Sequence, residues 1–300
     1  MRNTFLNTLV TCAETNKRIC LVVGDLGYSV VEPFRDCFGP CFLNAGIAEQ
    51  NMTGVAAGMA MSGSKVFTYS IANFPTLRCL EQIRNDICYH GADVTVVAVG
   101  GGIGYGSLGY SHHAVQDIAC LRGFPGILMA TPGDPNEVIG VTQYLCQKYA
   151  GPCYLRLGKG GEPTVGQLLS EIAPGIRKIV ARSKEAILAC GGTLGWVAPI
   201  AESHGATLAS CPLWWPDRRS REGIVDFIGE HSRVVVVEEH LSSGGFGSFV
   251  REQLEDHPEL QSRVRCLALD ERSCGTVGSP GFIRKASGLD ADAIGRALVS

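Results

Sequence analysis

One acidic side chain stands out because its neighbours are almost all small or apolar. Glu49 is the only acid in the segment 44–63, NAGIAEQNMTGVAAGMAMSG, and the pattern places it in the first turn of a helix. The positive end of a helix dipole favours a carboxylate there even when it is solvated and has no further task. Small neighbours would also let another molecule pack close, and burial would then favour the neutral acid, which can exchange a proton. The pattern alone leaves both interpretations open.

Two adjacent histidines are a second candidate for chemistry. His112 and His113 lie in the segment 110–122, YSHHAVQDIACLR, at the predicted start of a helix beyond a glycine-rich loop. Neighbouring residues on a helix point about 100° apart, and no further pair of ligands is near, so a zinc site is not expected. We expect one histidine to face a pocket as a proton carrier and the other to hydrogen-bond the backbone.

Two arginines lie near the edges of otherwise apolar elements. Most arginines placed like Arg122 and Arg156 are surface or salt-bridge residues, but a planar guanidinium near a substrate entrance would suit a phosphate. The nearby loop GYGSLG, 104–109, matches GxGxxG, yet no helix opens inside it and no acidic residue closes a later strand. We therefore interpret it as a flexible loop whose backbone approaches a ligand, not as a dinucleotide site.

The elements that must position these residues alternate along the chain. Short apolar and β-branched runs predict strands at 19–23, 65–70, 93–99, 126–130 and 152–157. An amphipathic N-terminal helix precedes them, and further helices are predicted at 47–62, 75–90, 114–123 and 135–149. Near-continuous apolar strands separated by helices predict a parallel sheet that is covered on both faces.

The pattern restarts after a stretch rich in glycine and proline, 158–178, which we interpret as a linker. Strands are predicted at 186–190, 206–211, 233–239 and 264–269. Helices are predicted at 196–204, 221–231, 246–256 and 291–299. We therefore expect an α/β protein with two doubly wound domains, at 1–165 and 180–300.

Composition narrows the class of protein. A formal charge of -3 over 300 residues gives no reason to expect a nucleic-acid partner or an acidic membrane surface. Charged residues make up 18% of the chain, which is low for a soluble domain, and apolar residues 45%, so we expect an oligomer that hides apolar surface. The 13 cysteines contain no CxxC pair and the sequence has no apolar run long enough to span a membrane. These features favour a reduced, cytoplasmic setting.

The order of these blocks resembles transketolase. The segments LNAGIAEQNMTGVAAGMA, then Phe74, Arg78 and QIRND, then GYSHHAVQDIACLR, ATPGDPNEV and YLRLGKG are similar to its pyrimidine-binding half. Deoxyxylulose-phosphate synthases have the same order of blocks. The later segment EEHLSSGGFGSFV resembles the transketolase C-terminal domain. The resemblance covers nearly all of the chain and implies a pyrimidine-binding domain for thiamine diphosphate, followed by a smaller transketolase C-terminal-like domain.

A complete transketolase also has an N-terminal domain, in which a GDG motif and a later asparagine hold magnesium and the cofactor diphosphate. This sequence has only GDLG at 24–27, in the other domain. The resemblance therefore implies the C-terminal (beta) subunit of a split transketolase, active only with a partner subunit. That N-terminal subunit would hold Mg²⁺ and the diphosphate, in an α2β2 heterotetramer that acts on sugars or sugar phosphates.

The resemblance also gives the candidate residues their expected roles. In the family, the glutamate at the position of Glu49 hydrogen-bonds the aminopyrimidine ring of thiamine diphosphate and assists proton removal from the cofactor. His112 would contact substrate hydroxyls or a developing oxyanion. The cofactor is assigned to Glu49, Tyr69, Phe74 and Arg78, and the substrate to His112, His113, Arg122 and Arg156.

One departure from the family concerns the sugar. Many transketolases have an aspartate four residues before the histidine, where it binds a hydroxyl of the acceptor, whereas this sequence has Leu108. An apolar side chain there would suit an acceptor that is deoxygenated, branched or otherwise unlike common pentose phosphates.

Two alternatives stay open at this point. The beta subunit of a pyruvate-dehydrogenase-type 2-oxo acid decarboxylase shares the two-domain plan and the glutamate, although the SHHAVQDIACLR segment is closer to transketolase. A non-catalytic regulatory subunit could keep the fold and lose the chemistry. Glu49 and His112 argue against that second alternative because both are present.

Overall fold

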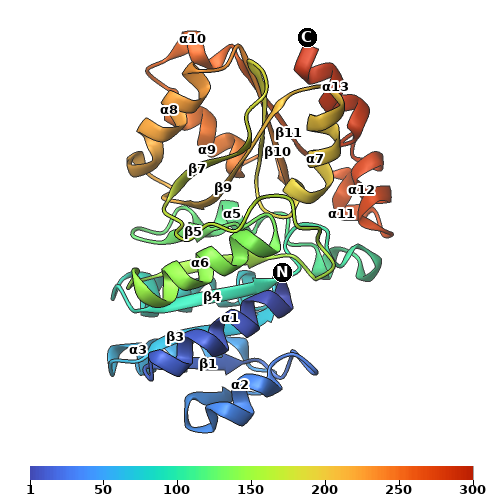
Figure 1. Ribbon diagram of the computed structural model, residues 1–300. Coiled ribbons are helices and arrows are strands. Elements are labelled where there is room, and N and C mark those ends of the chain that lie inside the picture. The colour runs from blue at the N-terminus through green and yellow to red at the C-terminus, as the bar shows by residue number, and fades with distance from the viewer. Residues whose placement is uncertain (300) are drawn as a thin grey trace.

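The computed structural model describes residues 1–299. Its centre is one large sheet with helices on both faces (Figure 1). The strands of the first half are β1 (Ile19–Val23), β2 (Phe42–Asn44), β3 (Lys65–Ile71), β4 (Val94–Val99), β5 (Leu128–Ala130) and β6 (Cys153–Leu157). Those of the second half are β7 (Gly175–Val180), β8 (Glu185–Ala189), β9 (Thr207–Trp214), β10 (Arg233–Leu241) and β11 (Val264–Leu269).

The strand order is β11-β10-β8-β9-β5-β6-β4-β3-β1-β2, and β7 pairs with β9. Strands within each half run parallel, except that β7 is antiparallel to β9. Every residue of β1 and β4 is buried, as expected for parallel strands covered on both faces. The predicted doubly wound α/β fold is therefore confirmed.

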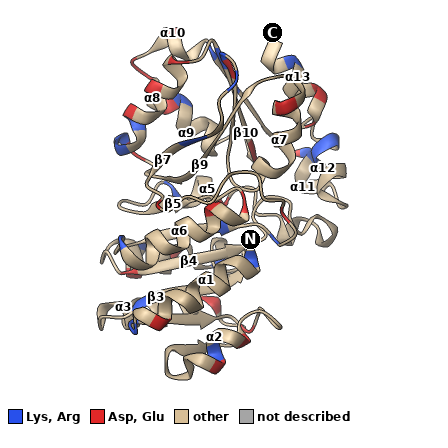
Figure 2. Ribbon diagram, viewed as in Figure 1, with Lys and Arg blue, Asp and Glu red and all other residues tan. Residues whose placement is uncertain are grey.

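Helices cover the sheet in two layers. In the first half, α1 (Arg2–Thr15), α2 (Glu32–Cys37) and α6 (Pro135–Gln147) cover one face, and α3 (Glu49–Met61) and α5 (Asp117–Leu121) cover the other. In the second half, the helices are α7 (Thr193–Ser203), α8 (Arg221–Gly229), α9 (Phe246–Gln253), α10 (Pro258–Gln261), α11 (Arg272–Gly275), α12 (Pro280–Ala286) and α13 (Ala291–Val299). Figure 2 shows that charged residues of both signs lie mainly on these helices and on loops.

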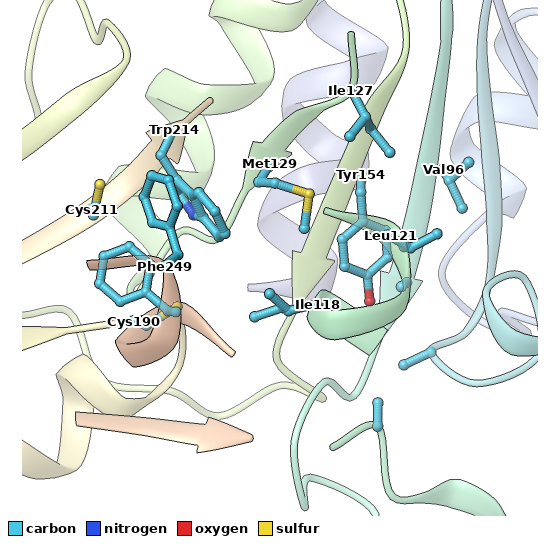
Figure 3. Packing of buried hydrophobic residues seen from close by; sticks show 14 of the residues in the cluster. Val96, Ile118, Leu121, Ile127, Met129, Tyr154, Cys190, Cys211, Trp214 and Phe249 are labelled. Atoms are coloured by element: carbon cyan, nitrogen blue, oxygen red, sulfur yellow. The ribbon is translucent and has the colours of Figure 1, made fainter. Parts of the chain in front are cut away.

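The two halves share a core where their strands meet. Strand β5 pairs antiparallel with β9, with Met129 opposite Trp214. Trp214 is fully buried and stacks on Phe249 of α9, with the ring centroids 4.5 Å apart. Figure 3 shows these side chains beside Tyr154 and Ile118 from the first half. The sheet is therefore continuous, and the division into domains at 1–165 and 180–300 stays a prediction.

Several element predictions need correction. The helix predicted over 114–123 begins only at Asp117, because Ala114 pairs with Gly102 in an extended bridge. The segment predicted as one helix over 75–90 contains a 3₁₀ turn at Leu77–Cys79, one short α turn, α4 (Leu80–Gln82), and a π-helical turn at Ile83–Cys88. The strand β7 begins inside the predicted linker. None of the described helices is both long and apolar enough to cross a membrane.

Candidate functional site

Four of the candidate residues gather at the carboxyl edge of the first half of the sheet. Strands β1, β3, β4 and β6 run parallel, so the loops that follow them lie along the same edge. In α/β sheets this edge is where ligands usually bind. The loop after β3 carries Phe74 and Arg78, and the loop after β4 carries His112.

Glu49 is the first residue of α3 and is only 2% exposed. Its carboxylate Oε2 accepts a hydrogen bond from Nη1 of Arg78 at 2.6 Å, and the Arg78 side chain is 49% exposed. The Arg78 guanidinium also lies over the ring of Phe74, 4.9 Å from the ring centroid. A buried carboxyl is thus covered by a cation that water, or a ligand, can reach from outside.

His112 joins the same cluster from the loop after β4. Its ring meets the ring of Phe74 edge to face, with the centroids 5.4 Å apart, and lies 6.1 Å from the ring of Tyr105. Its Nδ1 is 3.0 Å from the hydroxyl of Ser111. The structure therefore brings Glu49, Arg78, Phe74 and His112 together, although 63 positions separate the first from the last.

His113 and Tyr69 lie inside the protein. His113 is fully buried, and its Nε2 is 3.4 Å from the carbonyl of Gly106, so one histidine does bond the backbone as expected. This burial contradicts a substrate contact by His113. Tyr69 is only 3% exposed, and burial raises the pKa of its phenol far above the ordinary value. Phe74, not Tyr69, is therefore the aromatic side chain that contacts both Arg78 and His112.

Arg156 does not reach the substrate side. Its Nε donates to Oδ2 of Asp117 at 2.7 Å, and its Nη2 donates to the carbonyls of Ala114 and Glu239 at 2.8 and 3.0 Å. The side chain is 5% exposed. The predicted phosphate contact by Arg156 is therefore wrong for this structure, because its guanidinium is buried and already paired at the junction of the two halves.

Arg122 also links the two halves of the molecule. Its Nε donates to the carbonyl of Gly244 at 2.7 Å, and its two terminal nitrogens form a paired contact with the carboxylate of Glu252. Both partners belong to the second half of the chain, Glu252 on α9. Its side chain is 15% exposed, and these contacts with the second half give no support to the predicted phosphate contact by Arg122.

A loop that the sequence analysis did not assign to the site lies beside Glu49. Asp25 and Ser29, in the loop after β1, have positive φ angles of 53° and 64°, which are uncommon for residues other than glycine. A Cβ atom on Gly24 would lie in ordinary contact with Glu49, 3.5 Å from its Cγ, so this loop borders the buried acid directly. The sequence signal was GDLG, which attracted notice only as an incomplete diphosphate motif.

Two cations that the sequence analysis missed, Arg2 and Lys159, line a cavity near Tyr105. The cavity has a volume of about 500 Å³ and is also lined by neighbouring residues. The ammonium of Lys159 lies 4.9 Å from the ring centroid of Tyr105, the same ring that neighbours His112. Burial raises the pKa of Tyr105, and the positive charge of Arg2 opposes that rise. The acid of this cavity, Glu162, is paired with the amino group of Met1 at 2.8 Å.

Neither Arg2 nor Lys159 has a carboxylate partner within the residues described, 1–299. Their charges are therefore available to an anionic ligand. No pattern of period or spacing marked them, because Arg2 opens a helix and Lys159 follows a strand, and only the parallel sheet brings both to one edge.

The residues around Glu49 suit the pyrimidine end of thiamine diphosphate. A buried carboxyl can hydrogen-bond a ring nitrogen, and the Phe74 ring offers an apolar wall beside it. Ser70, whose hydroxyl lies with Glu49 around Gly24, has no hydrogen-bond partner for that buried hydroxyl in the described chain. A buried polar atom without a partner is uncommon, and it indicates that a polar group is missing from this pocket. Among residues 1–299, no group of three or more acidic, histidine or cysteine side chains could hold a metal ion.

Comparison with known proteins identifies the family of this chain. The family of transketolase pyrimidine-binding domains matches residues 1–162. The B subunit of apulose-4-phosphate transketolase from Actinobacillus succinogenes is 30% identical over 302 residues, which cover 98% of this chain and 96% of that protein. The protein of the same name from Phocaeicola vulgatus is 32% identical over 263 residues, covering 86% of this chain and 84% of that one.

A solved structure extends the likeness to three dimensions. A split-gene transketolase, described as an inactive beta4 tetramer, superposes with a TM-score of 0.85 and is 28% identical. The superposition covers 99% of this chain and 97% of that one, so the second half of the fold matches as well as the first. The chain therefore belongs to the transketolase family, and it matches split-gene transketolase subunits over nearly its whole length.

Proposed function

We propose that the chain is the beta subunit of a two-component transketolase that depends on thiamine diphosphate. It would transfer a two-carbon ketol unit from a ketose or ketose phosphate to an aldose acceptor. The observation that carries this proposal is the Glu49 carboxyl, buried at the start of α3 and covered only by the half-exposed Arg78. The names of the two similar apulose-4-phosphate transketolase proteins support the same reaction type.

The chemistry that thiamine diphosphate supplies when bound is a nucleophilic carbon, which accepts the two-carbon unit from the donor. The chain's first contribution is a proton at Glu49. An Oε atom of this carboxyl, which is 2% exposed, would hold a proton against a nitrogen of the pyrimidine ring. Phe74 would pack against the face of that ring, and Arg78 would leave its present contact with Oε2 when the cofactor enters.

His112 would act on the sugar. Its Nδ1 faces the Ser111 hydroxyl, so Nε2 is the atom free to approach a substrate oxygen. A proton or hydrogen bond delivered there would stabilise charge that develops on that oxygen as the carbon–carbon bond breaks or forms. His112 should therefore affect kcat more than the KM of the sugar.

The phosphate of the sugar would bind to Arg2 and Lys159, in place of the two arginines that the sequence suggested. Both cations line one cavity, and the Tyr105 ring connects that cavity with His112. Leu108, 54% exposed on the loop that carries His112, would face the acceptor. An apolar side chain at that place favours an acceptor that is deoxygenated or branched there.

A partner chain would complete the site. We propose that an N-terminal transketolase subunit with a GDG motif holds Mg²⁺ and the cofactor diphosphate, in an α2β2 assembly of the cytoplasm. Support comes from the names of the similar proteins, which describe each as one subunit of a transketolase. The split-gene relative adds to this, because its tetramer of beta chains alone is described as inactive.

The test is reconstitution. The purified chain alone, the partner subunit alone and their mixture would each be assayed with thiamine diphosphate, Mg²⁺, a ketose phosphate donor and an aldose acceptor. We expect turnover only in the mixture, and cofactor binding by the single chain that is much weaker than in the mixture. Tight cofactor binding and turnover by the chain alone would contradict the need for a partner. No turnover of any ketose by the mixture would contradict the transketolase activity itself.

A further inference from the structure

The turn that follows β3 places one amide side chain against the loop of His112. Three hydrogen bonds hold this turn: Ala72 N to the carbonyl of Val99 at 2.9 Å, Phe74 N to the carbonyl of Ile71 at 2.8 Å, and the Thr76 hydroxyl to the carbonyl of Ala72 at 2.5 Å. The turn is thereby fixed to the adjacent strand β4. The Asn73 side chain extends from this turn to the loop that carries His112.

Asn73 forms hydrogen bonds with the backbone on both sides of His112. Its Nδ2 donates to the carbonyl of Ser111 at 3.2 Å and to the carbonyl of His113 at 2.7 Å. A carboxamide nitrogen has two hydrogens, so one side chain can hold both carbonyls at once. Carboxylate and apolar side chains of similar size have no such hydrogens.

The buried His113 ring, 3.4 Å from the Gly106 carbonyl, and the pairing of Ala114 with Gly102 anchor the end of this loop, but neither contacts the backbone on both sides of His112. His112 lies in the 3₁₀ turn Tyr110–His112, which follows Gly109 at φ 77°. The other backbone bonds of this turn are local, from His112 N to Gly109 and from His113 N to Tyr110. Across residues 1–299, Asn73 is the one side chain outside the loop that donates to its backbone at 109–113.

We propose that Asn73 is a positioning residue for His112. It fixes the two peptide groups that flank His112, and this sets the edge-to-face contact of the His112 ring with Phe74 at 5.4 Å. Phe74 directly follows Asn73 in the sequence, so one turn positions both the ring that packs against His112 and the amide that holds its backbone. The effect of Asn73 on turnover therefore passes through the orientation of the imidazole, and in that respect the inference rests on the proposed role of His112.

The substitution Asn73→Asp tests this with almost no change in shape. A carboxylate has no hydrogen to donate and would face two carbonyl oxygens, so the loop should be released. Asn136→Asp is a matched control, because Asn136 also donates through Nδ2 to one backbone carbonyl, that of Gly166 at 2.8 Å, away from the site. Both variants remove an amide donor and add one charge.

The first measurement needs no activity. Histidine ring signals of the isolated full-length chain, which has seven histidines, are recorded by NMR with ring-labelled histidine. His112→Ala identifies the signal of His112. We expect that signal to shift or broaden in Asn73→Asp and to stay in place in Asn136→Asp. An unchanged His112 signal in Asn73→Asp would overturn the proposal.

The second measurement separates positioning from simple stability. In the reconstituted complex, Asn73→Asp should lower kcat by about 10- to 100-fold, the scale expected when a reacting group is misplaced by about 1 Å, with a smaller change in KM. When His112 is already alanine, adding Asn73→Asp should lower kcat by less than about twofold more, because the two residues act as one unit. Full, additive losses, or a kcat of Asn73→Asp equal to that of the unaltered complex, would overturn the proposal. If the complex turned over no sugar, the proposed function would fail, and the histidine spectra would still decide the inference about Asn73.

Discussion

Two arginine–carboxylate pairs of nearly equal length behave differently in this molecule. Arg78 and Glu49 are 2.6 Å apart, and Arg156 and Asp117 are 2.7 Å apart. The Arg78 side chain is 49% exposed, whereas that of Arg156 is 5% exposed. The first pair lies at the open edge of the sheet and the second lies where the two halves meet. The length of a pair thus says little about what the pair can do.

The surroundings of the second pair explain the difference. Oδ2 of Asp117 also accepts a hydrogen bond from the Tyr154 hydroxyl at 2.5 Å, and Arg156 holds carbonyls from both halves. Burial acts to raise the pKa of Asp117, but the charges of Arg156 and His240 and the hydrogen bonds from Arg156 and Tyr154 together hold that pKa below its usual value. A cation fixed in this way strengthens the junction and is not free for a ligand. Arg78 has no such second set of partners, so a ligand can replace it.

The largest effect on the free energy of unfolding should come from breaking the buried pair of Arg156 and Asp117. Arg156→Ala removes the cation and leaves the buried carboxylate of Asp117 with the Tyr154 hydroxyl as its hydrogen-bond donor, and we expect the free energy of unfolding to fall by about 3 to 5 kcal/mol. Chemical denaturation of the purified chain measures this. If Arg156→Ala instead kept full stability and selectively lost affinity for phosphorylated sugars, the assignment of this arginine to the junction would be wrong.

The contribution of a second buried acid, Glu238, to the free energy of unfolding should change with pH in the opposite direction from that of Asp117. Glu238 is fully buried and accepts only backbone N–H groups, of Phe246 and Gly247, and burial raises its pKa from 4.5 to about 7. The folded state then binds more protons than the unfolded state between these values, so its stabilising contribution is present below pH 4.5 and is lost as pH rises to about 7. The rise corresponds to on the order of 3 kcal/mol.

Glu238→Gln isolates this contribution, because glutamine does not titrate. The difference in free energy of unfolding between the unaltered chain and Glu238→Gln should move in favour of the glutamine variant as pH rises from 4.5 to 7. A difference that stays constant over this range would show that Glu238 titrates normally in the folded protein.

The next prediction concerns the affinity for substrate and the two cations without a carboxylate partner among residues 1–299, Arg2 and Lys159. Lys159→Gln should weaken a phosphorylated substrate by about 1.5 to 3 kcal/mol, the scale of a hydrogen bond to a charged group, and should hardly change an unphosphorylated analogue. The change should appear mainly in KM. Lys148→Gln is the matched control, because Lys148 is an exposed lysine paired with Glu171 on another surface. Equal losses for both classes of sugar would remove the phosphate from this cavity.

The smallest effect on stability should come from the half-exposed pair. Because Arg78 is 49% exposed although Glu49 is 2% exposed, Arg78→Ala should lower the free energy of unfolding by less than the about 3 to 5 kcal/mol expected for a fully buried pair. Truncation of a half-exposed side chain lets water reach the Glu49 carboxyl, which limits the cost. A loss as large as that of Arg156→Ala would show that both pairs are structural, and the comparison would fail.

The fold could largely be predicted because its strands are apolar on both faces. Runs such as 93–99 and 233–239 can be recognised without knowing which strands they pair with, and both are strands in the structure. The helix expected at 114–123 was misplaced because Ala114 pairs with Gly102, a residue of an earlier loop that local periodicity does not report. Short strands with little pattern, such as Phe42–Asn44, gave no signal of their own.

The site was only partly predictable, for a different reason. Sequence order and resemblance identified Glu49, Phe74, Arg78 and His112, and the structure brings these together. Which arginine is free depends on burial and on partners up to 130 positions away, such as Glu252 for Arg122. That information is in the tertiary packing and not in local spacing.

The central claim is that the Glu49 carboxyl moves a proton on the bound cofactor. Its most direct test is the exchange of the C2 hydrogen of thiamine diphosphate for deuterium in the reconstituted complex, compared between the unaltered chain, Glu49→Gln and the control Glu81→Gln, an exposed acid on α4. Glutamine keeps the shape and removes the acid. We predict exchange that is slower by about 100- to 10,000-fold in Glu49→Gln and unchanged in Glu81→Gln. An unchanged rate in Glu49→Gln, with the variant folded and the cofactor bound, would contradict the account.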